Sequence, residues 1–289
     1  MTFDPRSTLD PSQVRDRRGR GLGGARGLSV AGGGIALVLA LAYVLLGGDP
    51  ADLAGTVGVE TGSKPVDTTL ESECASGADA NARTDCRIVG YVNSVQAYWE
   101  GEFAASGLSY QPAETVLFTG FVETGCGTAS SAVGPFYCPS DGNVYLDLGF
   151  FEDLLVRLGA EGSLAQGYVI AHEYGHHAQD LLGDLSVAGG QEGPEGRAVR
   201  TELQADCYAG VWAAHAESTG FLEPLTEEQV GDALGAAAAV GDDRIQQQAQ
   251  GQVNPETWKH GSSAQRQKWF LEGFKTGAPA ECDTFGGAI

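Results

Sequence analysis

The pentapeptide His172-Glu173-Tyr174-Gly175-His176 contains the residues of this chain best suited to chemistry. Residues four positions apart lie on one face of an α-helix, so the imidazoles of His172 and His176 could bind one metal ion. Glu173 lies beside them and could take a proton from an attacking water, whose pKa zinc lowers from about 15.7 to about 7. This spacing predicts a catalytic zinc site for hydrolysis, most often of peptide bonds.

The residues around the motif predict the helix that it needs, with Ser163 as its N-cap and Gly183 at its end. Apolar side chains recur between them at helical spacing: Leu164, Tyr168, Ile170, Ala171, Ala178, Leu181 and Leu182. His177 lies about 100° around the helix from His176, so we expect it to pack or form hydrogen bonds rather than bind the metal. Gly175 disfavours a helix by about 1 kcal/mol relative to Ala, which indicates that another segment approaches closely there. The alternative, an exposed helix with solvated histidines, is disfavoured by the apolar face.

A third ligand is expected from a second helix, predicted at 194–220, which contains E-L-Q-A-D at 202–206. Glu202 and Asp206 lie one turn apart on the same face of such a helix. Glu202 could therefore bind the metal, while Asp206 accepts a hydrogen bond from the outward N–H of a zinc-bound histidine. The alternative is a solvated acidic face or a surface ion pair between Glu202 and Arg200 or Arg197. The short separation from the first motif favours the metal site.

Several segments of the chain resemble known zinc peptidases. A helix with H-E-x-x-H followed by one with E-x-x-x-D is similar to the gluzincin branch of the zinc metallopeptidases, in which the Glu of the second helix is the third ligand. From about residue 73 onward, the chain resembles more closely the bacterial family of putative neutral zinc metallopeptidases. The similar segments are H-E-Y-G-H-H-A-Q (172–179), E-L-Q-A-D-C-Y-A-G-V-W (202–212), G-P-F-Y-C-P (134–139), V-Y-L-D (144–147), G-D-D-R-I-Q-Q-Q-A-Q-G (241–251) and H-G-S-S-A-Q-R (260–266). The resemblance implies one Zn²⁺ held by His172, His176 and Glu202, with a protein or peptide as the substrate.

An uncharged apolar stretch at 28–46 is long enough for a helix to cross the hydrocarbon of a bilayer, which is about 30 Å thick. The preceding residues 1–27 carry six arginines and three aspartates, a charge of +3. By the positive-inside rule this basic leader stays in the cytoplasm, so 28–46 is predicted as a single transmembrane signal anchor in the cell membrane. A cleaved signal peptide is the alternative, but the apolar core is longer than usual and no A-x-A site follows it. Residues 47–72 would form a flexible stalk, and 73–289 the extracytoplasmic catalytic domain.

Six cysteines fit an oxidising location outside the cytoplasmic membrane. Closeness in the sequence favours two local disulfides, Cys74–Cys86 and Cys126–Cys138. The two remaining cysteines would then form the pair Cys207–Cys282. No C-x-x-C occurs, which disfavours a zinc cluster built on thiolates. Buried free thiols in a cytosolic protein are the alternative, and the predicted membrane span argues against it.

The charge of the chain disfavours nucleic acid as a partner. The formal net charge is −21, and the residues after the leader, with 11 basic and 35 acidic side chains, carry −24. Such a surface repels phosphate and keeps a domain soluble, and it would favour cationic peptides as substrates. Neither a G-x-x-x-x-G-K-[ST] phosphate loop nor a G-x-S-x-G nucleophile motif occurs.

The expected elements place the motifs in an α+β domain. A helix at 86–103 precedes two strands at 115–122 and 143–148. Capping boxes beginning at Thr226 and Ser262 predict two later helices. This order predicts a zincin-like metallopeptidase domain, mostly helical with a small sheet, in which a strand at the edge of the cleft could hold an extended peptide.

Two functions of different classes fit these features. The first is a membrane-anchored, extracytoplasmic zinc peptidase with Glu173 as general base. The second is a non-catalytic binding module stabilised by zinc, which needs no base beside the metal. A third possibility, hydrolysis of cell-wall peptide, has no separate wall-binding module to support it.

His260 is a candidate for a second catalytic residue. It precedes the helix expected to begin at Ser262, where a rigid helix start could position its ring in a cleft. Hydrolysis by zinc develops negative charge on the carbonyl oxygen, and His260 could donate a hydrogen bond to it. The alternatives are that His260 caps the helix or packs against Trp258, and that Tyr137 or Tyr145 is the donor.

Overall fold

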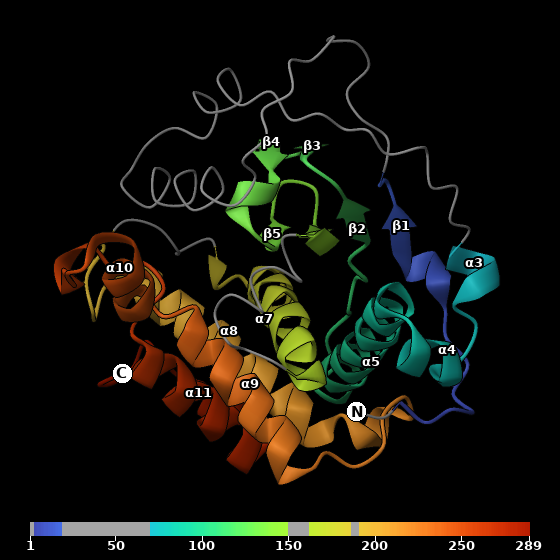
Figure 1. Cartoon of the computed structure of the whole chain (residues 1–289). Helices are drawn as coiled ribbons and strands as arrows, with labels where there is room; N and C mark the ends of the chain where they lie inside the picture. The colour runs from blue at the N-terminus through green and yellow to red at the C-terminus, as the bar shows by residue number, and fades with distance from the viewer. Residues whose placement is uncertain (1–2, 19–69, 150–161, 186–190) are drawn as a thin grey trace, which may run out of the picture.

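The computed structural model describes residues 3–18, 70–149, 162–185 and 191–289 of the chain (Figure 1). In this part the protein has a helix-rich α+β fold with a small sheet, as the sequence predicts. The transmembrane segment predicted at 28–46 and most of the predicted stalk lie outside these residues. Among the helices described, none combines the length and the apolar character needed to cross a membrane.

The longer helices include the two that carry the predicted metal ligands, α7 and α8. They are α5 (Thr84–Ala105), α7 (Ser163–Leu182), α8 (Arg197–His215), α9 (Glu227–Ala239) and α11 (Ser263–Thr276). Helix α7 lies in the middle and packs against α5, α8 and α9, while α11 packs along α8 and α9 (Figure 1). The shorter helices are α3 (Leu70–Glu73), α4 (Gly77–Ala82) and α10 (Asp242–Gln250).

Two glycines let α11 lie directly on α8. A Cβ at Gly210 of α8 would overlap the carbonyl oxygen of Phe270, and a Cβ at Gly273 of α11 would overlap that of Cys207. Larger side chains at either position would push the two helix backbones apart, because both obstacles are backbone atoms. Helix α11 is therefore held close to the helix that carries the predicted third ligand.

A four-stranded sheet lies across α7 from α11 (Figure 1). Its strand order is β1-β2-β6-β5, with β1, β2 and β6 parallel and β5 antiparallel to β6. A separate antiparallel hairpin is formed by β3 and β4. The strands are β1 (Val14–Asp16), β2 (Thr115–Phe118), β3 (Phe121–Thr124), β4 (Gly127–Ser130), β5 (Phe136–Cys138) and β6 (Asn143–Asp147).

The N-terminal residues 3–18 are part of this domain. The side chain of Phe3 is fully buried and meets the ring of Tyr91 of α5 edge-on, with 5.0 Å between ring centroids. A Cβ at Gly90 would strike the Phe3 ring, so glycine leaves the space that this ring fills. The side-chain amide of Asn81 donates to the carbonyl of Phe3 at 2.9 Å and accepts from its N–H at 3.0 Å.

Strand β1 also joins this segment to the sheet. It runs parallel to β2, and Arg15 of β1 forms an ion pair with Glu114 at 2.8 Å. Residues 3–18 therefore belong to the same folded unit as the later residues, and not to the separate leader that the sequence predicts. One crossing of a membrane at 28–46 would put β1 and β2 on opposite sides. A cytoplasmic N-terminus and an extracytoplasmic catalytic domain are therefore incompatible with this sheet.

Several helix boundaries differ from the predicted ones: α5 spans Thr84–Ala105 rather than 86–103, and α8 ends at His215 rather than at 220. Ser163 is the first residue of α7 and not its N-cap. Helix α8 begins at Arg197 rather than Pro194, because the N–H of Gly196 first closes a turn by donating to the carbonyl of Gly193 at 2.9 Å. Both predicted capping boxes are present, and they open α9 and α11.

The strand predicted at 115–122 is broken into β2 and β3. Gly120 lies between them with a φ of 79°, a conformation that favours glycine. Its N–H donates to the hydroxyl of Ser131 at 3.0 Å and to the carboxylate of Asp147 at 2.9 Å. The chain therefore leaves the sheet at Gly120 and enters the β3–β4 hairpin.

Candidate metal centre

Helix α7 presents His172 and His176 on one face, with 4.8 Å between their ring centroids. Glu202 reaches them from α8, and its carboxylate oxygens lie 3.2 Å from Nε2 of His172 and 3.4 Å from Nε2 of His176. Donor atoms of all three residues lie within 4.8 Å of one another. The structure thus brings together the three predicted ligands, which form the His₂Glu set of catalytic zinc sites.

The approach of α8 to α7 depends on Gly175. A Cβ at this position would lie 3.0 Å from the carbonyl oxygen and 3.1 Å from the Cα of Ala205. Both are backbone atoms of α8, so they could yield only if the helix moved. This is the close approach that a glycine inside the zinc-binding helix predicts.

Buried charge holds the outward nitrogen of His172. Its Nδ1 lies 2.9 Å from Asp206, which is fully buried and also accepts a hydrogen bond from the Tyr168 hydroxyl at 2.5 Å. The guanidinium of Arg266, from α11, donates to both carboxylate oxygens of Asp206 at 2.8 and 2.9 Å. Sequence reasoning did not identify Arg266, because 60 residues separate it from Asp206. Its one signal is its place in the similar segment 260–266.

A neutral amide holds the outward nitrogen of His176. Its Nδ1 lies 2.8 Å from Oε1 of Gln179, a fully buried residue three positions later on α7. This partner was also missed, although residues at this spacing share one face of a helix. A hydrogen bond at Nδ1 sets the tautomer and the ring orientation, so both histidines direct Nε2 toward Glu202.

The site stabilises positive charge where the donor atoms converge. Burial lowers the pKa of His172, but the charge and hydrogen bond of Asp206 outweigh it and raise this pKa to about 10. Burial raises the pKa of Glu202, but the adjacent His176 and His172 hold it well below the usual range of a glutamate. A divalent cation would replace these protons, because zinc binds neutral imidazole and ionised carboxylate. The donor set and its charges therefore fit Zn²⁺.

Glu173 lies at the same cleft as the three donor residues. Its side chain is buried, and burial raises the pKa of its carboxyl above the usual value, against the effect of the two neighbouring histidines. A carboxylate whose pKa lies closer to neutrality is better suited to accept a proton and return it.

The donor residues open onto a cleft of about 420 Å³. Strand β5 borders it at the edge of the sheet, where it contributes Phe136 and Tyr137. The larger apolar side chains that line it are Val133, Phe136, Val169, Val240 and Ile245. Among the described residues, the only acidic groups in this lining are Glu173 and Glu202. The negative charge of the chain is therefore not concentrated around the cleft in the described part.

The structure places His260 at this cleft, together with a partner that the sequence did not indicate. Nδ1 of His260 lies 3.0 Å from Asp242, and the imidazole side chain is 41% exposed. Asp242 is buried at the start of α10 and also accepts from the N–H groups of Lys259, His260 and Gly261 at 2.8, 2.7 and 3.1 Å. Burial lowers the pKa of His260, and Asp242 more than offsets this and raises it. Asp242 therefore holds the His260 ring through Nδ1, and Nε2 is not bonded to this carboxylate.

The two tyrosines considered as alternative donors are engaged elsewhere. Tyr137 lines the cleft, but its hydroxyl donates to Asp180 at 2.7 Å. Tyr145 donates to Asp141 at 2.8 Å and is not part of the cleft lining in the described part of the chain. His177 forms hydrogen bonds, as expected, with 3.2 Å between its Nδ1 and the Tyr137 hydroxyl.

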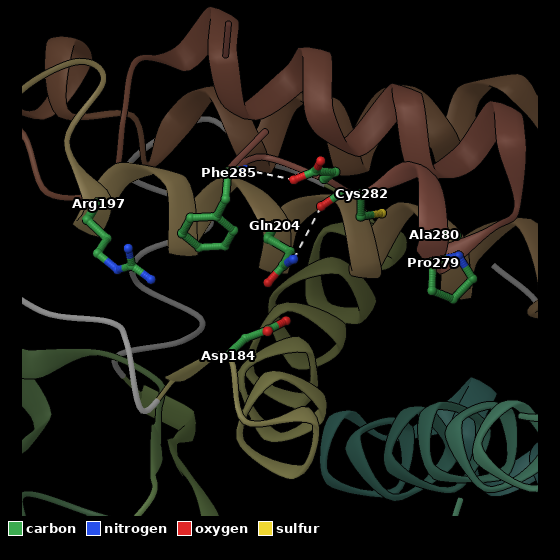
Figure 2. Close-up of a pocket in the computed structure, with 8 residues that line it drawn as sticks. Asp184, Arg197, Gln204, Pro279, Ala280, Cys282 and Phe285 are labelled. Atoms are coloured by element: carbon green, nitrogen blue, oxygen red, sulfur yellow. Dashed lines mark hydrogen bonds between the residues drawn. The ribbon is translucent and has the colours of Figure 1, made fainter. Parts of the chain in front are cut away.

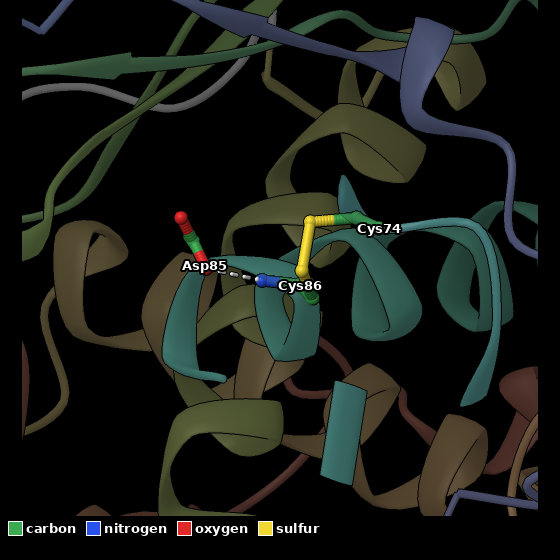
Figure 3. Close-up of side chains that lie close together, drawn as sticks. All are labelled: Cys74, Asp85 and Cys86. Atoms are coloured by element: carbon green, nitrogen blue, oxygen red, sulfur yellow. Dashed lines mark hydrogen bonds between the residues drawn. A yellow bond between two sulfur atoms is a disulfide. The ribbon is translucent and has the colours of Figure 1, made fainter. Parts of the chain in front are cut away.

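Three disulfides join the cysteines in the pairs expected from the sequence. They are Cys74–Cys86, Cys126–Cys138 and Cys207–Cys282. Figure 3 shows the first disulfide beside Asp85, which accepts a hydrogen bond from the backbone N–H of Cys86 at 3.0 Å. Among the described residues, Cys74, Asp85 and Cys86 form the second cluster of side chains of the kinds that bind metals, besides His172, His176 and Glu202. Because the sulfur atoms of Cys74 and Cys86 are bonded to each other, these two residues cannot bind a metal as thiolates.

Residues 4–285 match the model of a protein family described as putative neutral zinc metallopeptidase. The chain belongs to this family. The match begins far before residue 73, where the sequence resemblance was expected to start, and it includes strand β1. The N-terminal segment is thus within the region that the family model describes.

Two bacterial proteins have sequences similar to this chain. An uncharacterized protein of Mycobacterium tuberculosis is 52% identical over 254 residues, which cover 85% of this chain and 85% of the relative. The uncharacterized protein YpfJ of Escherichia coli K12 is 40% identical over 289 residues, which cover 97% and 98% of the two chains. No solved structure matches this chain.

Proposed function

We propose that this protein is a zinc-dependent peptidase that hydrolyses peptide bonds of a protein or peptide substrate. The observation that carries the proposal is the convergence of His172, His176 and Glu202 at an open cleft, with the carboxylate of Glu173 beside them. Zinc bound there would supply a Lewis acid that lowers the pKa of water and polarises a carbonyl group. A metal site that only stabilises the fold is closed by four protein ligands, and among the described residues this site offers three.

The side chains around the site then have distinct roles in hydrolysis. Glu173 takes a proton from the attacking water and passes it to the nitrogen of the leaving amine, so that the C–N bond breaks and Glu173 is ionised again. The protonated ring of His260 donates from Nε2 to the carbonyl oxygen, on which negative charge develops. Strand β5 offers its edge to an extended peptide, as in β-augmentation.

We also propose that the enzyme acts outside the cytoplasm and attaches to the membrane through residues 28–46. The three disulfides support this location, because such bonds persist in oxidising compartments. The apolar sequence of 28–46 supports the attachment. Since residues 3–18 fold with the domain, the attachment would leave both flanks of 28–46 on one side of the membrane.

The Glu173→Gln variant tests the peptidase proposal. It keeps the size of the side chain and removes the base, so we expect zinc to stay bound while peptide hydrolysis falls by at least about 10²-fold. The measurements are zinc content of the purified protein and cleavage of a peptide library by variant and parent. Equal cleavage by both, or no cleavage by a zinc-loaded parent, would favour the binding module instead.

A further inference from the structure

The two predicted zinc-binding histidines are supported in different ways. His172 is held by the charged pair of Asp206 and Arg266, whereas His176 is held by the neutral amide of Gln179. At its outward nitrogen, His176 is therefore held by a hydrogen bond to a neutral group and not by a charged pair. Whatever orients the Gln179 amide also orients this ring.

The amide of Gln179 has one possible orientation in this structure. Its Nε2 donates to the carbonyl of Thr201 at 2.8 Å and to Oε1 of Gln204 at 2.8 Å. Both N–H groups of the amide are thus occupied by acceptors from α8, and its oxygen must face His176. Because that oxygen can only accept, Nδ1 of His176 carries the proton and Nε2 keeps its lone pair for a metal.

The amide of Gln204 is oriented in turn by the C-terminal segment. Its Nε2 donates to the carbonyl of Cys282 at 3.3 Å (Figure 2). The side chain of Gln204 is almost fully buried. The disulfide between Cys207 and Cys282 joins the same two segments. A hydrogen bond from the hydroxyl of Thr284 to the carbonyl of Arg200, at 2.7 Å, also connects the C-terminal segment to α8.

We propose that Gln179 and Gln204 are positioning residues that act in series on the metal ligand His176. The carbonyl of Cys282 orients Gln204, Gln204 orients Gln179, and Gln179 sets the tautomer and direction of the imidazole. This inference rests on the proposed zinc site, but zinc affinity tests it without any measurement of hydrolysis. A residue that fixes the outer nitrogen of a metal-binding histidine typically affects metal affinity by about 10–100-fold.

The variants Gln179→Met and Gln204→Met test the series arrangement. Methionine nearly preserves the volume of glutamine and removes its hydrogen bonds. We expect Gln179→Met to raise the dissociation constant for zinc by about 10–100-fold, and Gln204→Met to raise it by less. The double variant should resemble Gln179→Met, because Gln204 acts through Gln179 and the two effects are not additive. The measurement is competition for Zn²⁺ with a chelator in the purified full-length protein.

Gln96→Met is the matched control. Gln96 is a buried glutamine of α5 whose Nε2 donates to Gln13 at 2.9 Å, and it is not among the described residues that line the cleft. We expect it to lower the Tm of the zinc-free protein and leave zinc affinity unchanged. Zinc binding by Gln179→Met that equals the parent, or additive effects in the double variant, would overturn the proposal. A parent protein that binds no zinc would instead refute the metal site itself.

Discussion

At the scale of single residues, the site combines buried charges that depend on one another. Asp206 is fully buried and is bonded to His172, Tyr168 and Arg266. Burial raises the pKa of Asp206, but the charges of Arg266 and His172 more than offset this and keep it below the usual value. Removing one member therefore leaves an uncompensated charge in the interior, with consequences for both stability and metal binding.

The Asp206→Ala variant should show both consequences. Loss of the carboxylate leaves Arg266 buried without its partner, which should lower the free energy of unfolding by about 3–5 kcal/mol. It should also weaken zinc binding by about 10–100-fold, because His172 loses its outer hydrogen bond. Urea unfolding and chelator competition measure the two effects. Adding Arg266→Met should recover stability but not zinc affinity, and recovery of both would contradict this assignment.

The pair of His260 and Asp242 predicts the pH dependence of hydrolysis. With Nδ1 bonded to Asp242, the ring of His260 can donate from Nε2 only when it is protonated. Asp242 holds the pKa of His260 above its usual value, so activity should fall as the pH rises through this raised pKa. Asp242→Asn removes the charge that raises the pKa and should therefore move the alkaline limb of kcat to lower pH.

A second variant, His260→Ala, removes the proposed donor itself. It should lower kcat by about 10²-fold with zinc content and thermal stability nearly unchanged. Rates measured across the pH range for the parent and both variants decide the role of this pair. An alkaline limb at the same pH in Asp242→Asn, or full activity in His260→Ala, would remove His260 from the mechanism.

At the scale of elements, the metal centre depends on the distance between α7 and α8. The two histidines lie on α7 and Glu202 lies on α8, so any shift between these helices changes the spacing of the donor atoms. Gly175 permits the observed distance because the backbone of Ala205 occupies the space of a Cβ. The close contact between Gly175 and Ala205 therefore sets the distance from the two histidines on α7 to Glu202 on α8.

The Gly175→Ala variant should separate α7 from α8 and raise the dissociation constant for zinc. Alanine improves helix propensity by about 1 kcal/mol, but here its Cβ meets backbone atoms that cannot yield alone. Gly231→Ala in α9 is the control, because a Cβ there meets nothing within 4 Å and should stabilise the protein by up to about 1 kcal/mol. Chelator competition and thermal unfolding compare the two. Undiminished zinc affinity in Gly175→Ala would show that the helices can adjust.

At the scale of the whole molecule, residues 3–18 share one core and one sheet with the part of the chain that carries the candidate metal centre. Phe3 is buried against α5, and β1 pairs with β2. Any attachment of 28–46 to a membrane must leave these two parts on the same side.

Thiol labelling in intact cells tests this arrangement. All six cysteines lie in disulfides, so a single added Cys would be the one free thiol. Arg6→Cys reports on the N-terminal segment and Leu108→Cys on the domain, since these side chains are 87% and 50% exposed. We expect a membrane-impermeant maleimide to label both variants alike. Labelling of one position but not the other would show that the two parts lie in different compartments.

The sequence by itself determined the features that depend on local spacing. A period of 3.6 residues places His172 and His176 on one helix face, and capping boxes at Thr226 and Ser262 mark helix starts. The disulfides Cys74–Cys86 and Cys126–Cys138 each join cysteines that are 12 residues apart, so closeness in the sequence was enough to predict both pairs. Such patterns are readable because each is set within a few turns of backbone.

Tertiary structure alone decided which distant residues support the site. The bonds of Arg266 to Asp206, of Gln179 to Gln204 and of β1 to β2 join segments that are far apart in the sequence. The pairing of His260 with Asp242 spans 18 residues across a helix whose start was not predicted. These contacts depend on how helices and strands pack, and packing is set by the shape of the entire core rather than by local propensity. Zinc-binding spacing is therefore visible in the sequence, while the hydrogen bonds that orient the ligands appear only in the folded chain.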